Sequence, residues 1–183
     1  DQTVGTLLTG ESSANKRIIY SVPPATLAVN QSANSEYNGS FTGAVSLVKF
    51  GTGSLLLTGT NATFGKFSVS NGVLAVGATG TFGPNSTNIV VGGGGTLLLS
   101  NSVAIANSAS VAMPASGIST AKINLASGVN ETVSRLVYGG KMQRAGTYGS
   151  TSSTAVNKDD THFAGSGMLT VLYDNSGTLV KVR

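Results

Sequence analysis

The chain has 183 residues, only 10% of which are charged, and its formal net charge is +4. This length is enough for one domain with a hydrophobic core, and an apolar fraction of 40% excludes a disordered polar tract. The basic residues are scattered and Trp is absent, so we expect no nucleic-acid binding. No run of about 18 apolar residues occurs, so we expect no transmembrane segment. Because the chain has no Cys, disulfides and thiolate metal sites are excluded.

Small and polar residues dominate the composition: Gly, Ser, Thr and Asn together account for 84 of the 183 residues. Apolar segments are three to six residues long and are separated by Gly, Asn or Thr. This pattern is typical of many short strands joined by tight turns, and no convincing amphipathic helix is present. We therefore expect an all-β, single-domain protein.

Residues 1–25 are expected to form an N-terminal cap or an irregular first rung. The chain begins with Asp1 rather than Met, so we expect that a leader, a tag or an upstream region has been removed. The segment VPPA at 22–25 interrupts a regular strand, because Pro cannot donate to a strand ladder. The segment DQTVGTLL at 1–8 is amphipathic and suited to adding to the strand edge of a neighbouring chain. It contributes the first part of a candidate self-assembly edge: Val4, Thr6, Leu7 and Leu8.

Residues 26–140 contain two series of similar short strands and form the predicted body of the fold. One series begins at regular intervals of 21 residues, at Ser46, Phe67, Asn88 and Ala109. The other begins at intervals of 19 to 28 residues, at Thr26, Ser54, Val73, Thr96 and Lys122. Periods of this length indicate a repeat architecture.

A period of about 21 residues is too short for a pair of helices and fits one rung of a parallel β-helix, or β-solenoid. We expect about five to seven rungs, with the strands of successive rungs about 4.8 Å apart. Inward-facing side chains then stack in columns, one of which contains Leu57, Val76 and Leu99. Gly and Asn are expected at the corners, as at 59–61 and 70–72, where the backbone often needs a positive φ.

The stretch GTGSLLLTGTNATFGKFSVSNGVLAVG at 51–77 resembles the autotransporter-associated β-strand repeat. The matching positions are Lys49, Gly51, Gly53, Leu55, Leu57, Gly59, Asn61, Phe64, Gly65, Asn71, Gly72, Leu74 and Val76. In addition, 121–143 and 145–171 resemble the closing segment of large secreted bacterial repeat proteins. These resemblances imply a β-solenoid that is secreted or displayed on the bacterial cell surface. They imply location and shape rather than an activity.

Residues 141–183 are expected to close the solenoid as a C-terminal hairpin cap. The segment YDNSGTL at 173–179 is predicted to be the turn that joins strands at 168–172 and 179–182. The apolar residues of the last strand complete the candidate self-assembly edge: Leu179, Val180 and Val182.

The sequence offers few groups for catalysis or metal binding. His162 is the only histidine, and beside Asp159 and Asp160 it is interpreted as part of a polar turn in which an Asp caps backbone amides and His162 lies at the surface. The predicted body carries only two acids, Glu36 and Glu131, which are too far apart in sequence to lie on neighbouring rungs as a catalytic pair. We therefore expect no enzyme activity, no cofactor and no metal site.

Two further features are candidates for binding sites. The segment GGGG at 92–95 is followed by a strand and not by Lys-Ser/Thr and a helix, so we interpret it as a corner between strands rather than a phosphate loop. Tyr138 and Tyr148 are candidates for carbohydrate contact if they share a face. The alternative, favoured by the absence of Trp, is that they cap and pack the last rungs.

Without an evident chemical site, function is expected to lie in shape and surface. A parallel β-helix has an unpaired strand edge at each end, and such an edge templates further strands unless it is capped. We expect a non-catalytic extracellular structural module: a surface stalk, an adhesin segment or a fibre subunit. Its expected partners are further copies, joined end to end as a homo-oligomer or filament, and a polysaccharide or a host or cell surface. The alternative is a carbohydrate-binding accessory module of a larger secreted protein.

Overall fold

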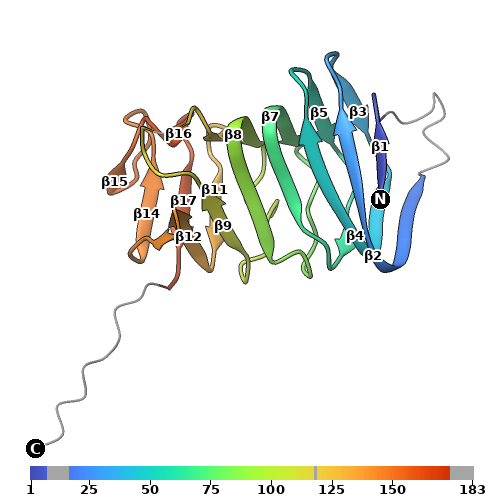
Figure 1. Ribbon diagram of the computed structural model, residues 1–183. Helices are drawn as coiled ribbons and strands as arrows, with labels where there is room; N and C mark the ends of the chain where they lie inside the picture. Colours follow the sequence, from blue (N-terminus) through green and yellow to red (C-terminus); the bar gives the residue numbers. More distant parts are fainter. Residues whose placement is uncertain (8–16, 118, 174–183) are drawn as a thin grey trace, which may run out of the picture.

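The computed structural model describes residues 1–7, 17–117 and 119–173, and Figure 1 shows them as strands wound around one axis. The described residues form strands, turns and bends. Among them there is no helix with the length and apolar character needed to cross a membrane. The chain makes about six turns of parallel coil with about 22 residues per rung. The predicted all-β parallel β-helix is therefore confirmed.

The strands differ widely in length, from two residues to 13. In chain order they are β1 (Gln2–Val4), β2 (Ile18–Asn30), β3 (Ser35–Tyr37), β4 (Ser40–Phe50), β5 (Ser54–Leu57), β6 (Ala62–Thr63), β7 (Phe67–Val76), β8 (Asn88–Leu99), β9 (Ser110–Met113), β10 (Lys122–Leu125), β11 (Asn130–Val133), β12 (Arg135–Tyr138), β13 (Lys141–Met142), β14 (Gly146–Gly149), β15 (Asn157–Lys158), β16 (Phe163–Ala164) and β17 (Met168–Val171).

Parallel pairing arranges these strands in three stacks along the solenoid. Stack 1 runs from β1 through the second halves of β2 and β4 and the first parts of β7 and β8 to β9 and β12. Stack 2 contains β3, β5, the last parts of β7 and β8, β10 and β16. Stack 3 contains the first parts of β2 and β4, then β6, and later β11 and β17. Between β6 and β11 it continues through a bridge from Thr60 to Thr81 and a hydrogen bond from Phe82 N–H to the Ala104 carbonyl.

The register confirms one predicted strand series from Ser54 onward, and it corrects both the first member of that series and the spacing of the other series. In stack 2, Ser54 pairs with Val73, Val73 with Thr96 and Thr96 with Lys122, as expected. Thr26, however, pairs with Ser46 in stack 1, and β3 takes the first position in stack 2. The spacing in stack 1 is also not a constant 21 residues, because Leu47 pairs with Phe67 and Phe67 with Ile89. Corners of variable length absorb these differences, while the strand ladder keeps its own spacing.

The core consists of side-chain columns that run through the rungs. The predicted column of Leu57, Val76 and Leu99 is confirmed, and Tyr37 and Leu125 extend it at its two ends. Stack 1 adds a second column, which contains Leu47, Phe67, Ile89, Val111 and Leu136. All ten of these side chains are buried, and burial of each contributes roughly 1.5–3 kcal/mol.

The segment that resembles the autotransporter-associated repeat forms corners and contacts between rungs. Gly72 adopts φ +65° at the bend of β7 between stacks 1 and 2, a backbone conformation that favours Gly. At Gly59, a Cβ atom would collide with the carbonyl oxygen of Gly39 in the preceding rung. Asn61 is buried and joins three rungs, because its Oδ1 accepts a hydrogen bond from Phe41 N–H at 2.8 Å and its Nδ2 donates to the Thr81 carbonyl at 2.5 Å.

The two ends of the solenoid are built differently. At the C-terminal end, stacks 1 and 3 finish with antiparallel strands, since β13 pairs with β12 and β14 pairs with β17, whereas stack 2 finishes with the short parallel strand β16. At the N-terminal end, β1, the first part of β2 and β3 are all paired in parallel. The predicted interruption at VPPA is a register shift inside β2, between Ser21 and Ala25. Parallel pairing with β4 already begins at Ile18, which lies inside the predicted N-terminal cap.

Candidate functional site

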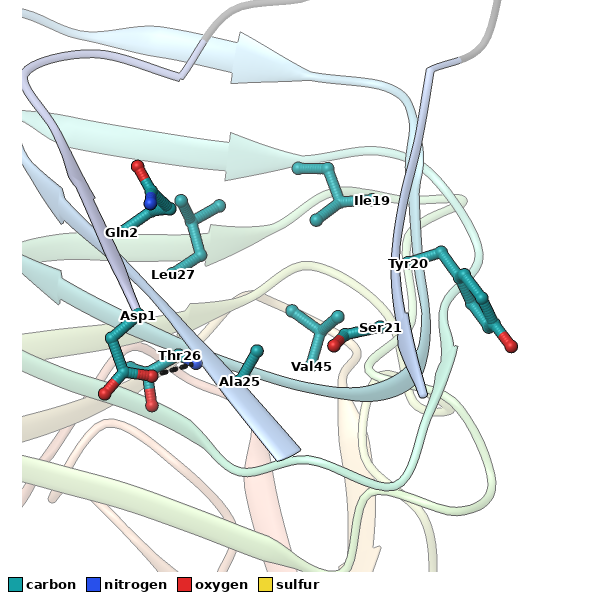
Figure 2. Close-up of a pocket in the computed structure, with 9 residues that line it drawn as sticks. All are labelled: Asp1, Gln2, Ile19, Tyr20, Ser21, Ala25, Thr26, Leu27 and Val45. Atoms are coloured by element: carbon teal, nitrogen blue, oxygen red, sulfur yellow. Dashed lines mark hydrogen bonds between the residues drawn. The ribbon is translucent and has the colours of Figure 1, made fainter. Parts of the chain in front are cut away.

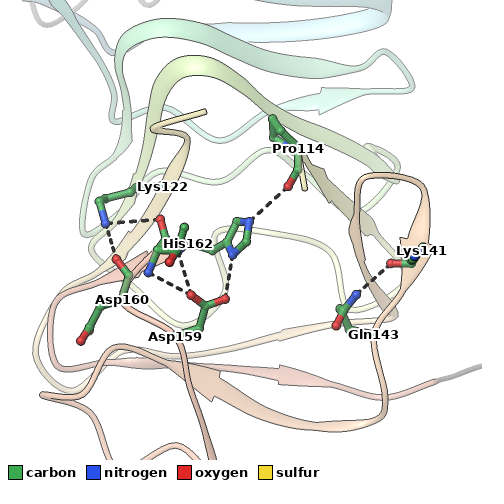
Figure 3. A network of polar contacts seen from close by, with 8 residues as sticks. Pro114, Lys122, Lys141, Gln143, Asp159, Asp160 and His162 are labelled. Carbon is green, nitrogen blue, oxygen red and sulfur yellow. Dashed lines mark hydrogen bonds and ion pairs between the residues drawn. The ribbon is translucent and has the colours of Figure 1, made fainter. Parts of the chain in front are cut away.

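The Asp159–His162 turn was the first candidate for chemistry, and Figure 3 shows how its side chains are engaged. Asp159 Oδ1 accepts hydrogen bonds from the backbone N–H groups of Thr161 at 2.9 Å and His162 at 3.2 Å. The predicted capping role of an Asp is therefore confirmed. The predicted surface position of His162 is wrong, because only 3% of this residue is exposed.

Both nitrogens of the His162 ring are occupied by protein acceptors. Nδ1 lies 2.7 Å from Oδ2 of Asp159, and Nε2 lies 3.1 Å from the carbonyl oxygen of Pro114. The ring also stacks on Tyr138, with centroids 4.0 Å apart and planes 7° from parallel. Neither nitrogen points to solvent or to a pocket, so the ring is placed to tie the closing segment to the end of stack 1. Within the ranges that the structure describes, no group of three or more His, Asp or Glu side chains could hold a metal ion.

Asp160 fastens the same segment on its exposed side. Its carboxylate accepts hydrogen bonds from the N–H of Thr151 at 2.8 Å and from the Thr151 hydroxyl at 2.9 Å. These bonds hold the pKa of Asp160 below its usual value. Lys122 of β10 donates to the backbone carbonyls of Asp160 and Thr161. The polar cluster at 159–162 thus holds the last rung in place through hydrogen bonds.

Glu131 is fully buried in β11, a position that its charge did not predict. Its Oε2 accepts hydrogen bonds from the N–H groups of Ala104 at 2.8 Å and Ile105 at 3.3 Å, and its Oε1 accepts one from Thr132 N–H at 3.2 Å. Burial raises the pKa of Glu131 to about 7, although the backbone hydrogen bonds oppose that shift. The carboxylate binds a stretch of the preceding rung of stack 3 that has no regular strand.

Glu131 and Glu36 do not form a catalytic pair. Glu36 is exposed in β3, in the first rung of stack 2, and accepts a hydrogen bond from the Thr58 hydroxyl at 2.8 Å. Glu131 lies in stack 3, near the opposite end of the solenoid. Their separation agrees with the sequence-based expectation that they do not lie on neighbouring rungs.

Lys49 is also fully buried, in the inward column of stack 1 between Val29 and Val69. Its Nζ donates to the carbonyls of Phe50 at 3.1 Å and Gly51 at 2.8 Å, and lies 3.4 Å from the carbonyl of Asn71 in the next rung. Burial lowers the pKa of Lys49 from its usual value. The ammonium group therefore satisfies corner carbonyls inside the solenoid and is not available to a ligand.

The GGGG segment and the two tyrosines are likewise parts of the architecture. Residues 92–95 form the bend inside β8 between stacks 1 and 2, as the corner interpretation predicted. Tyr148 is buried, and its hydroxyl donates to the Arg144 carbonyl at 2.8 Å. Tyr138 stacks on His162 and its hydroxyl oxygen is buried. Burial raises the pKa of both Tyr138 and Tyr37. The tyrosines at 138 and 148 pack the closing segment and present no shared exposed face.

The N-terminal end carries a pocket bordered by exposed apolar side chains. Figure 2 shows a pocket of about 190 Å³ at this end, in which Ile19, Leu27 and Val45 face one another while Tyr20 points away. Asp1 closes one side of the pocket by accepting a hydrogen bond from Thr26 N–H at 2.8 Å. Exposed apolar side chains occur along β2 beside it, namely Ile18, Tyr20 and Val22.

The structure describes only some of the residues of the predicted self-assembly edge. Val4 and Leu7 are half-buried and pack against the core, and Thr6 is exposed. β1, which contains Val4, is the first strand of stack 1 and pairs with residues 27–29 of β2. The remaining predicted residues, Leu8, Leu179, Val180 and Val182, lie outside the described residues.

Comparisons of the chain with protein-family models, with curated proteins and with solved structures found no match. The β-solenoid architecture therefore stands on the structure itself. The resemblance of 51–77 to the autotransporter-associated repeat rests on the residues quoted for it.

Proposed function

We propose that this chain is a non-catalytic structural module of a secreted or surface-displayed bacterial protein: a stalk, an adhesin segment or a fibre subunit that joins other chains end to end through strand edges. The observation that carries the proposal is the edge of the first part of β2 at the N-terminal end, with which no strand of the described residues pairs, beside a largely apolar pocket. Edges of this kind add further strands unless they are capped. At the C-terminal end, by contrast, stacks 1 and 3 finish with antiparallel strands.

The roles of the unusual polar residues support a structural function. Asp159, His162, Glu131 and Lys49 each bind backbone groups or each other inside the fold. Groups that are engaged in this way hold rungs together. The motif resemblance at 51–77 adds the expectation of a bacterial secreted or surface protein.

Sedimentation velocity and negative-stain electron microscopy of the purified chain over a dilution series test the proposal. We expect assemblies that grow with concentration and whose width stays that of one solenoid. A chain that remains monomeric at all concentrations and is retarded in polysaccharide gels would refute the proposal and favour a carbohydrate-binding module.

A further inference from the structure

The first part of β2, residues 18–21, has one paired and one open edge. Its paired edge runs along β4, from Ile18 opposite Ser40 to Ser21 opposite Gly43. In the part of the chain that the structure describes, no strand pairs with its other edge, because β1 reaches only residues 27–29. We call residues 18–21 the acceptor edge.

The backbone groups of the acceptor edge are oriented for strand addition. Ser40 N–H donates to the Arg17 carbonyl at 3.0 Å, so the backbone groups of Arg17 point toward β4. Successive residues of a strand point these groups to opposite sides. The N–H and C=O groups of Ile18 and Tyr20 therefore point to the open side. Pro23 and Pro24 have no N–H, so the edge suited to pairing ends just after residue 21.

The acceptor edge also carries exposed apolar side chains, which are typical of a surface that another strand covers. Ile18 is 66% exposed and Tyr20 is 64% exposed. Ile19 points the other way, over the pocket that Leu27 and Val45 line (Figure 2). A strand added at this edge would cover the pocket and extend the core of stack 3 by one rung.

The chain contains a second apolar segment whose sequence is suited to this position. Residues 179–182 read LVKV, and they follow β17 after a polar stretch. β17 pairs with β11 along one edge and with β14 along the other. Since both edges of β17 are occupied, the predicted hairpin between 168–172 and 179–182 has no edge to use. Residues 179–182 themselves lie outside the described residues.

Length decides whether this segment can reach the acceptor edge of its own chain. Along stack 3, six rung steps separate the acceptor edge from β17, a distance of about 29 Å at the usual strand spacing. Leu179 follows Tyr173 by six residues, and six fully extended residues span at most about 22 Å. The segment therefore falls short of its own acceptor edge and can only reach that of another copy.

We propose that residues 179–182 of one copy add as a strand to the acceptor edge of the next copy, which joins the chains head to tail. This inference rests on the proposed function and names the two surfaces that meet. Alternation along the added strand puts Val180 and Val182 on one side, toward the pocket, and Lys181 on the outer side near Tyr20. Because the two surfaces differ, the contact is heterologous, and it propagates into a filament when the rotation does not close.

Complementation between two defective full-length variants tests this pairing. The donor variant carries Val180→Asp and Val182→Asp, and the acceptor variant carries Tyr20→Pro, which removes an N–H on the open side. Val156→Asp is the matched control, because Val156 is apolar, 83% exposed and part of the closing segment. Sedimentation velocity measures each protein alone and the equimolar mixture of donor and acceptor variants. Circular dichroism checks that every variant is folded.

We expect the wild type and the control to assemble, each defective variant to remain monomeric, and their mixture to stop at a 1:1 dimer. A fluorescein-labelled peptide of residues 174–183 should bind the donor variant at least tenfold more tightly than it binds the acceptor variant. If the acceptor variant does not fold, competition between this peptide and wild-type assembly gives the same information. Assembly of the donor variant at wild-type concentrations would overturn the inference and leave the proposed function standing. A wild-type chain that never assembles would overturn both.

Discussion

The substitution Glu131→Gln should change how the stability of the solenoid depends on pH. The wild-type carboxyl group is fully buried and has a pKa of about 7, raised from 4.5 by desolvation. Between these two values the folded state keeps a proton that the unfolded state releases. The free energy of unfolding therefore falls as pH rises through this window and levels off above pH 7. The amide side chain introduced by the substitution would stay neutral throughout, and its oxygen could still accept the N–H groups of Ala104 and Ile105.

The size of the effect follows from the width of the window. Each pKa unit corresponds to about 1.4 kcal/mol, so a shift from 4.5 to about 7 amounts to roughly 3 kcal/mol at most. This value already includes the effect of the three backbone hydrogen bonds to the carboxylate, which favour its charged form and oppose the shift. We expect the difference in stability between Glu131→Gln and wild type to grow by about 1–3 kcal/mol from pH 4.5 to pH 7.5, in favour of the variant.

Equilibrium denaturation in guanidinium chloride at half-unit intervals from pH 4.5 to 8.5 measures this difference. Other titrating groups cancel when the variant is subtracted from the wild type at each pH. Glu36→Gln is the matched control for the loss of a carboxyl group, because Glu36 is exposed. A constant difference between Glu131→Gln and wild type over the whole range would refute the reasoning.

Four further substitutions, and one control at Gly92, test the contacts between rungs, each by the free energy of unfolding at pH 7. Lys49→Met should lower it by about 2–4 kcal/mol, because the carbonyls at the corner lose a charged donor. Asn61→Ala removes both hydrogen bonds that join its three rungs and should lower it by about 2–3 kcal/mol. Leu57→Ala should leave a cavity in the stack 2 column at a cost of about 2–5 kcal/mol. Gly59→Ala should cost at least about 2 kcal/mol, whereas Gly92→Ala, where a Cβ atom meets nothing within 4 Å, should stay within about 0.5 kcal/mol. Equal effects of the two Gly substitutions would contradict the close contact between rungs at Gly59.

The buried charges show which part of the candidate site was visible in the sequence. Lys49 follows Leu47 by two positions, and Glu131 lies between Val129 and Val133, so both are in phase with inward-facing apolar residues. Alternation alone therefore places them inside. Alternation does not predict their hydrogen-bond partners, because Glu131 binds backbone groups 26 and 27 residues away in another rung.

His162 is a second residue whose surroundings the local sequence does not predict. Its neighbours in sequence are polar, which is typical of an exposed turn. Its burial depends on Pro114 and Tyr138, which belong to earlier parts of the chain and meet His162 only when the closing segment folds over the last rung. No pattern within the turn itself encodes these contacts.

The sequence by itself determined the all-β class, the repeat of about 21 residues, the inward column through Leu57 and the use of Gly and Asn at corners. These features depend on alternation and spacing along the chain, which are local properties. The tertiary structure alone decided that Thr26 pairs with Ser46, that stacks 1 and 3 finish with antiparallel strands at the C-terminal end, and that residues 18–21 pair along one edge only with strands of the described residues. Corners can gain or lose several residues while the hydrogen-bonded ladder keeps its spacing, so the register between rungs is settled only when the side chains of neighbouring rungs pack together.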